Sequence, residues 1–305
     1  QRDYYGIEVE VESTRAFPTI FQIRYPIDGN PKISIVIPNK DHAEDLRRCI
    51  SSIESKSTWN NYEIVVVENN STEQSIFDYY KELEQKPQVK VTAYTGEFNY
   101  SRINNYGVTF TSGEYLLFLN NDTEVISPDW MEQMLMYAQR QDVGAVGAKL
   151  YYGDNTIQHA GVVIGLGAHR SAGHTHYKMP REHLGYMGRL CYAQDVTAVT
   201  GACLMVKRSV YEEVGGLDET FTISLNDVDF CLKIREKGYL NIFTPFAELY
   251  HYESKTRGME EGEKLRRYER ECEHFRERWK AQLDAGDPYY NPNFSLDYSD
   301  FTLRF

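Results

Sequence analysis

The sequence is poor in cysteine and has no long hydrophobic run. Its 305 residues include five cysteines, which are scattered and never spaced as CxxC. This pattern argues against a disulfide framework or a thiolate zinc site, and it predicts a reducing compartment. The longest apolar stretch, residues 197–206, is far too short to cross a bilayer, so we expect no transmembrane segment.

Positive charge is also scarce. The chain has 33 Lys and Arg residues against 45 Asp and Glu residues, which gives a net charge of -12. This balance argues against nucleic acid or an anionic membrane as a general partner, although a local basic pocket for phosphate stays compatible with it. We therefore expect a cytoplasmic protein, with the inner face of the cell membrane as an alternative location.

The first half of the chain alternates strand patterns with helix patterns. Short β-branched runs predict buried strands at residues 32–38, 63–68, 89–94 and 114–119. Apolar residues at helical spacing predict helices at residues 41–55, 73–85 and 103–111. Asp41 is a candidate N-cap for the first helix. This alternation favours parallel strands with right-handed crossovers, and hence an α/β fold.

The second half alternates less regularly. Strands are expected near residues 143–150 and 161–164, and a loop rich in Gly and His follows at 165–188. After an apolar run come helices predicted at residues 208–214, 227–237 and 260–283, and then a turn-rich tail from residue 287. We divide the chain into an N-terminal extension at 1–30, a main domain at 31–258, and a C-terminal helix and tail at 259–305.

Polar clusters follow three of the predicted strands. They read Pro38-Asn39-Lys40-Asp41, Glu68-Asn69-Asn70-Ser71 and Asn120-Asn121-Asp122. In open sheets of this type, ligands bind beyond the carboxyl ends of the strands. The same residues also suit turns and helix caps, so each cluster alone has a purely structural alternative.

Three further residues are candidates for chemistry. Asp122 follows an apolar strand, where one carboxylate can hold a hard divalent cation, although an Asx-turn is the alternative. Asp227 opens a helix and is a candidate general base, whereas Asp229 lies deeper in the first turn; helix capping is the alternative for both. His251 follows a strand-like run and can complete the cation site or bind phosphate. The loop histidines match no standard zinc spacing.

The order of these motifs resembles family 2 glycosyltransferases with the GT-A fold. The resemblance covers residues 31–257 and is nearest to the rhamnosyltransferase-like branch, which builds bacterial surface polysaccharide. Besides the first two strand ends, the motifs that carry it are Ser101-Arg102-Ile103-Asn104-Asn105-Tyr106-Gly107, the stretch from Gly113 to Asp122, Thr200-Gly201-Ala202-Cys203, Gly215-Gly216-Leu217-Asp218-Glu219 and Asn226-Asp227-Val228-Asp229. The resemblance implies a three-layer α/β/α, Rossmann-like fold with a mostly parallel sheet.

The resemblance also implies a role for each matching position. Asp227 would be the catalytic base, and Asp122 and His251 would bind the cofactor, Mn²⁺ or Mg²⁺. The residues implied to bind the nucleotide-sugar donor are Pro38, Asn39, Glu68, Arg102, Asn104, Asn121, Gly201 and Ala202.

The sequence departs from the family pattern at three positions. Asn120 stands where the metal motif has its first aspartate, Asn226 stands where the base motif has glutamate, and Glu68 stands where aspartate is usual. With one carboxylate left in the metal motif, we expect the cation to bind firmly only together with the nucleotide diphosphate.

Two functions of different classes fit these observations. The first is an inverting transferase that moves a sugar from a UDP- or dTDP-sugar to a hydroxyl of a glycan or lipid-linked acceptor in bacterial polysaccharide synthesis. The second is a non-catalytic sugar- or protein-binding module that keeps the fold within a larger chain. The presence of Asp122, Asp227 and His251 together favours the transferase.

Overall fold

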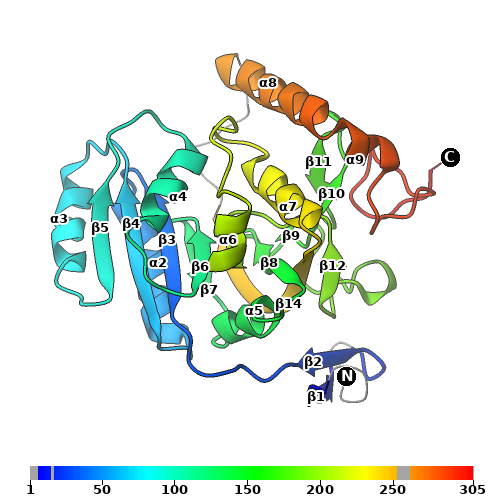
Figure 1. Ribbon diagram of the computed structural model, residues 1–305, viewed down its shortest axis with the longest axis horizontal. Helices are drawn as coiled ribbons and strands as arrows, with labels where there is room; N and C mark the ends of the chain where they lie inside the picture. The colour runs from blue at the N-terminus through cyan, green and yellow to red at the C-terminus, as the bar shows by residue number, and fades with distance from the viewer. Residues whose placement is uncertain (1–5, 15–16, 253–261, 305) are drawn as a thin grey trace.

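The structure, a computed structural model, describes residues 6–14, 17–252 and 262–304. Its main feature is a twisted mixed sheet with helices on both faces (Figure 1). The strand order is β12-β14-β8-β13-β6-β3-β4-β5, with β7 paired to β14 and β9 to β8. These strands span Ile33–Asn39 (β3), Tyr62–Glu68 (β4), Val89–Ala93 (β5), Tyr115–Leu119 (β6), Thr123–Val125 (β7), Val143–Tyr151 (β8), Ile157–His159 (β9), Gln194–Val196 (β12), Cys203–Lys207 (β13) and Leu240–His251 (β14).

The sheet consists of two parallel parts joined by an antiparallel strand. β3 pairs in parallel with β4 and β6, β4 pairs in parallel with β5, and β8 pairs in parallel with β14. Strand β13 lies between β6 and β8 and is antiparallel to both. This arrangement confirms the predicted α/β class and brings the start of β13 beside the carboxyl end of β6.

The two faces of the sheet have separate hydrophobic cores. On β3, Ile33, Ile35 and Ile37 belong to one core and Val36 to the other, as alternation along a strand requires. The first core receives helices Ala43–Lys56 (α2), Gln74–Leu83 (α3) and Trp130–Ala138 (α5), and the second receives Tyr100–Val108 (α4), Arg208–Glu213 (α6) and Asn226–Glu236 (α7). The molecule therefore has three layers, α/β/α.

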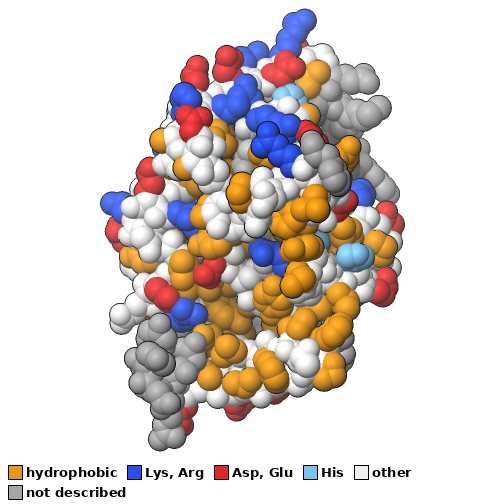
Figure 2. All heavy atoms as spheres, turned by 90° about the vertical axis from the view of Figure 1, so that its right-hand side faces the viewer, with side chains coloured by type: hydrophobic (Ala, Val, Ile, Leu, Met, Phe, Trp, Pro, Cys, Tyr) orange, Lys and Arg blue, Asp and Glu red, His pale blue; other side chains and the backbone are white. Residues whose placement is uncertain are grey.

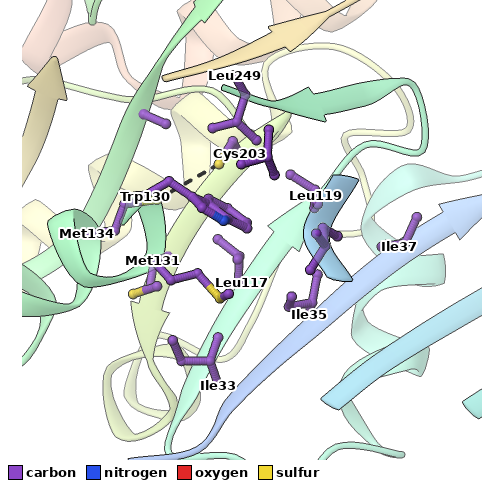
Figure 3. Packing of buried hydrophobic residues seen from close by; sticks show 14 of the residues in the cluster. Ile33, Ile35, Ile37, Leu117, Leu119, Trp130, Met131, Met134, Cys203 and Leu249 are labelled. Atoms are coloured by element: carbon purple, nitrogen blue, oxygen red, sulfur yellow. Dashed lines mark hydrogen bonds between the residues drawn. The ribbon is translucent and has the colours of Figure 1, made fainter. Parts of the chain in front are cut away.

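Helix α5 was not expected from the sequence. Its Trp130 is fully buried in the first core, beside Leu117 and Met131 in Figure 3. All but one of its nine residues are buried, so the segment has no polar stripe to give it a helical period. The N-cap expected at Asp41 is also wrong: His42 occupies the N-cap position of α2, and its side chain makes no capping hydrogen bond. The Asp41 carboxylate instead accepts hydrogen bonds from the Thr72 and Glu73 backbone amides at the start of α3.

The N-terminal segment forms a small hairpin of its own. Strands Glu10–Ser13 (β1) and Phe21–Arg24 (β2) pair antiparallel. Gln22 donates a hydrogen bond to Gln133 of α5 at 2.8 Å, and Arg24 pairs with Asp129 at 3.4 Å. The hairpin is therefore fixed against α5, at the bottom of Figure 1.

The C-terminal segment packs on the second core. The helix expected at 260–283 is two helices, Glu263–Arg278 (α8) and Lys280–Ala285 (α9), which meet at the non-helical Trp279. Residues 260 and 261 and the expected boundary at 258 lie outside the described residues. Residues 287–304 then fold back onto strands Val162–Ile164 (β10) and Ala172–His174 (β11).

The face that carries this segment is partly apolar. It forms the right-hand side of Figure 1, and Figure 2 shows hydrophobic side chains gathered over much of it. Exposed hydrophobic residues in the C-terminal segment and the loop beneath it include Tyr186, Met187, Tyr298 and Leu303. No helix among the described residues is both long and apolar enough to cross a membrane.

Candidate active site

The polar residues at the ends of β3 and β4 hold each other in place. The Asn39 side chain is buried, donates to the Tyr80 hydroxyl at 2.8 Å, and accepts from the Asn121 amide at 2.6 Å. One carboxylate oxygen of Glu68 accepts from the Ser71 backbone amide. Asn39 and Glu68 thus use several of their hydrogen-bonding groups to stabilise the turns. Pro38 and Glu68 are half-buried at the sheet edge.

Asp122 and His251 meet because two strands bring them together. β7 pairs with β14 so that His251 lies opposite Thr123, the residue after Asp122. The His251 Nε2 atom is 3.1 Å from a carboxylate oxygen of Asp122 and 3.0 Å from the Asn120 amide nitrogen. Both side chains are largely buried.

Gln158 of β9 orients the ring of His251. Its side-chain oxygen lies 2.6 Å from His251 Nδ1. Because an amide oxygen only accepts hydrogen bonds, Nδ1 carries a hydrogen, and the Nε2 atom of a neutral ring is then an acceptor that lies near both the Asn120 amide nitrogen and Asp122. A lone pair that faces a carboxylate at this distance is a favourable arrangement when a cation lies between them, so these residues fit a divalent metal ion.

A larger protein-only metal site is absent from the described parts of the chain. No group of three or more His, Cys, Asp or Glu side chains there is arranged to hold a metal ion. His159 of β9 and His174 of β11 contact each other instead through their Nδ1 atoms at 2.9 Å. Asp122 and His251 would therefore be the two protein ligands, and other ligands would come from water or substrate.

Asp227 lies in the first turn of α7 and is held by two backbone amides. Its carboxylate accepts from the Gly201 amide at 2.9 Å and from the Val228 amide at 2.9 Å. Gly201 belongs to the turn before β13, and a Cβ atom there would lie 3.0 Å from the Tyr100 hydroxyl, so glycine allows this close approach. Asp229 points the other way, is fully buried, and accepts from the Trp279 indole.

These elements surround one cavity of about 560 Å³. Asp227, His251, Gly201, Ala202 and Asn120 line it. Asn120 also donates its backbone amide to the Ala202 carbonyl at 3.1 Å, which joins the β6 end to the turn before β13. The structure thus brings the candidate base and the candidate cation site to the same cavity.

Comparison with known proteins identifies the family of the chain. A family model described as Glycosyl transferase family 2 matches residues 34–215, which is more than half of the chain. The chain belongs to glycosyl transferase family 2.

Longer bacterial proteins contain sequences similar to this glycosyltransferase chain. It is 46% identical over 289 residues to an uncharacterized protein, y4gI, of Sinorhizobium fredii, covering 94% of the chain and 32% of that protein. It is 36% identical over 298 residues to the O-antigen biosynthesis protein RfbC of Myxococcus xanthus, covering 96% of the chain and 22% of RfbC. The chain therefore spans a third or less of these relatives. Over 60 residues it is 35% identical to an N-acetylglucosaminyl-diphospho-decaprenol L-rhamnosyltransferase of Mycobacterium tuberculosis, covering 20% of each chain.

Solved structures agree on the fold. The structure of GalNAc-T7 with UDP, GalNAc and Mn²⁺ superposes with a TM-score of 0.64 at 16% identity, covering 82% of this chain and 48% of that one. The mannosyltransferase PcManGT of Pyrobaculum calidifontis, in complex with GDP-Man and Mn²⁺, gives a TM-score of 0.58 at 16% identity, covering 86% of this chain and 72% of that one. The GT-A fold expected from the sequence is thereby confirmed.

The motif at residues 101–107 of the glycosyltransferase is bound to the motif at residues 215–219. Arg102 is exposed and pairs with Glu219 at 2.9 Å. Asn105 accepts from the Leu217 amide, which fastens the Gly-Gly-Leu-Asp-Glu segment to α4. Asn104 is fully buried and donates to the Tyr100 carbonyl.

Several lining residues were not predicted as site residues. Tyr100 and Gln158 line the cavity from the middle of the chain, and Tyr268, Asp297 and Ser299 line it from the C-terminal segment. None belongs to the predicted polar strand ends, and the C-terminal residues lie in a stretch that has only helix or turn character in the sequence. Their position depends on long-range packing, which no local pattern reveals.

Proposed function

We propose that this chain is an inverting glycosyltransferase domain. It would transfer a sugar from a UDP- or dTDP-sugar to a hydroxyl of a glycan or lipid-linked acceptor in bacterial cell-surface polysaccharide synthesis. The observation that carries the proposal is the position of Asp227, which lines the same cavity as His251, the partner of Asp122, and is fixed by two backbone amides. The likeness to the O-antigen protein and to the rhamnosyltransferase supports the polysaccharide role.

Asp227 would act as the general base. Its carboxylate accepts the proton of the acceptor hydroxyl while the oxygen attacks the anomeric carbon of the donor sugar. The new carbon–oxygen bond forms as the bond to the phosphate oxygen breaks, and the nucleoside diphosphate leaves with the electron pair. Attack opposite to the leaving group inverts the anomeric centre, and base catalysis of this kind contributes about 10²–10⁴-fold to the rate.

We infer that a divalent cation would bind in the same cavity as this base. Asp122 and His251 would hold it, and Gln158 would keep His251 in the tautomer that exposes Nε2. When bound, such an ion offsets the negative charge that develops on a diphosphate leaving group. The Asn120 amide now contacts His251 where the family pattern has a second carboxylate. This substitution supports the expectation that the ion binds firmly only together with the diphosphate.

A thermal-shift screen tests the donor assignment. UDP-, dTDP- and GDP-sugars are each added with and without Mn²⁺, and the melting temperature of the full chain is measured. Because a ligand stabilises the folded state by RT ln(1 + [L]/Kd), we expect UDP- or dTDP-sugars to give the largest shift, and only with Mn²⁺. A chain that no sugar nucleotide stabilises in either condition would contradict the proposal.

A further inference from the structure

Tyr100 contacts both of the segments that position the candidate base. It is the first residue of α4, and it lines the cavity that contains Asp227. Its hydroxyl donates a hydrogen bond to the Gly201 carbonyl at 2.8 Å, and its backbone amide donates to the Thr222 carbonyl at 2.7 Å. Gly201 belongs to the turn before β13, and Thr222 belongs to the loop before α7. Tyr100 therefore joins α4 to the chain on both sides of the base.

The turn at Gly201 is the part of this arrangement that binds the base directly. The Gly201 amide donates to a carboxylate oxygen of Asp227 at 2.9 Å, while the carbonyl of the same glycine accepts from Tyr100. Because glycine has no side chain, its backbone dihedrals are only weakly restrained. A hydrogen bond to its carbonyl therefore restricts the rotations that would move its amide away from the carboxylate.

The space around Gly201 is also small. A Cβ atom there would lie 3.0 Å from the Tyr100 hydroxyl and 3.4 Å from the Asp227 Cβ. On the other side of the turn, the Ala202 carbonyl accepts from the Asn120 amide at 3.1 Å. The turn is thus held between α4, the end of β6 and the first turn of α7, and the Tyr100 hydroxyl makes the contact from α4.

The first turn of α4 is itself fixed by buried side chains. The Ser101 hydroxyl donates to the Phe221 carbonyl at 2.8 Å, and the Asn99 side chain donates to the Glu219 carbonyl at 2.9 Å. Both donor residues are buried. These hydrogen bonds attach the start of α4 to the loop before α7, and so the Tyr100 hydroxyl has a defined position relative to the turn that it binds.

We propose that Tyr100 is a positioning residue for the base Asp227. Its hydroxyl fixes the Gly201 turn, and the Gly201 amide in turn holds the Asp227 carboxylate in the orientation that receives the proton of the attacking hydroxyl. A small error in the orientation of a reacting group lowers the rate steeply. The effect of Tyr100 on the rate therefore passes through Asp227. This inference rests on the proposed transferase function.

A double-mutant cycle on the full chain tests this role. Tyr100→Phe removes the hydroxyl and keeps the ring. Tyr106→Phe is the matched control, because Tyr106 lies on the same helix, is also half-buried, and its hydroxyl is 3.3 Å from the Thr92 hydroxyl. Both substitutions are also made in Asp227→Asn. The measurements are kcat and KM for nucleoside diphosphate release from the UDP- or dTDP-sugar that gives the largest thermal shift, together with UDP affinity and melting temperature.

We expect Tyr100→Phe to lower kcat about tenfold while KM and UDP affinity stay near wild-type values, and Tyr106→Phe to keep the wild-type kcat. In Asp227→Asn, Tyr100→Phe should lower kcat no further, because a residue that acts through the base then has no base to position. A wild-type kcat in Tyr100→Phe would overturn the positioning role. A tenfold loss that persists in the Asp227→Asn background would overturn it as well.

The same measurements separate this role from the proposed function. A similar loss of kcat in Tyr100→Phe and Tyr106→Phe, with lower melting temperatures in both, would show that the hydroxyl of Tyr100 has only a structural role. A wild-type chain that releases nucleoside diphosphate from no sugar nucleotide would contradict the transferase function, and the positioning role with it. Loss of kcat in Asp227→Asn but not in Tyr100→Phe would leave the transferase function standing and remove the role of Tyr100.

Discussion

The contact between Asp122 and His251 is the chemically most informative pair in the molecule. Both are largely buried, and each presents an atom that favours a cation. Gln158 lies behind His251 and fixes the orientation of its ring. Partners of this kind behind a metal ligand commonly affect metal affinity 10–100-fold. The candidate cation site therefore includes Gln158 in addition to the two candidate ligands.

Substitution of Gln158 should weaken cation binding without removing a ligand. In the presence of UDP, we expect Gln158→Ala to raise the Kd for Mn²⁺ by about tenfold and Asp122→Asn to raise it further. Isothermal titration calorimetry measures both, with Asp78→Asn on the exposed face of α3 as the control. Wild-type affinity in Asp122→Asn would exclude this carboxylate as a ligand.

His176 should make the protein less stable in acid. Burial, with smaller contributions from Arg189 and His183, lowers the pKa of His176 to about 3, against 6.5 for an exposed histidine. Between pH 6.5 and 3 the unfolded chain binds this proton and the folded chain does not. The free energy of unfolding therefore falls as the pH falls through this window, by about 1.4 kcal/mol per pH unit from this residue.

Substitution of His176 measures its contribution to the pH dependence of stability. We expect urea unfolding of His176→Gln, followed between pH 6 and pH 4, to show a shallower loss of stability than that of the wild type. The exposed residue His274 of α8 provides the control, His274→Gln. Parallel pH profiles for His176→Gln and the wild type would show that His176 is protonated in the folded state.

At the scale of elements, the base depends on the contact between α8 and the loop before α7. The buried Glu271 carboxylate accepts hydrogen bonds from the backbone amides of Thr222, Ile223 and Ser224. Trp279 and Arg278 hold Asp229 on the inner side of α7. The C-terminal helix thereby fixes the segment that leads into Asp227.

Removal of the Glu271 carboxylate should loosen this loop. Because three partly buried amides lose their acceptor, we expect Glu271→Ala to lower the free energy of unfolding by about 2 kcal/mol. Glu273→Ala, on the exposed side of α8, should change it little. Urea denaturation of the two variants compares them, and equal stability would show that α8 does not hold the loop.

The sequence predicted the elements that have a local signal. β3 and β4 read as buried strands because their residues are β-branched and bounded by polar turns, and Asp227 rather than Asp229 was correctly expected to face the cleft. Helix α5 lacked a polar stripe, and the function of Asp41 as a cap for α3 depends on a neighbour across the sheet edge. Asp297 was missed for the same reason, since its place at the cavity depends on contacts with the loop at 165–177.

At the scale of the whole molecule, the N-terminal hairpin and α8 lie on opposite sides. Figure 1 shows the N-terminal hairpin at the bottom and α8 at the top. Tyr25 packs edge to face on Tyr137 of α5 and beneath the guanidinium of Arg140. None of these residues lines the cavity that contains Asp227. Stability and ligand binding should therefore respond differently to changes at the two ends.

Substitution of Tyr25 should change the stability of the protein without changing its affinity for a ligand. Since Tyr25 is 8% exposed, we expect Tyr25→Ala to lower the free energy of unfolding by about 2–4 kcal/mol and to leave UDP affinity unchanged. Urea denaturation and calorimetry on the same preparation give both values. A parallel loss of UDP affinity would show that the N-terminal segment is coupled to the site.

The central claim, that Asp227 is the base of a glycosyl transfer, is tested most directly by Asp227→Asn. The measurement is the rate of nucleoside diphosphate release from the donor that the thermal-shift screen identifies, together with nucleotide affinity, for the wild type, Asp227→Asn and the exposed control Asp284→Asn. We predict that Asp227→Asn lowers the rate at least about 10²-fold while nucleotide affinity and the control stay at wild-type values. Wild-type turnover in Asp227→Asn would contradict the account.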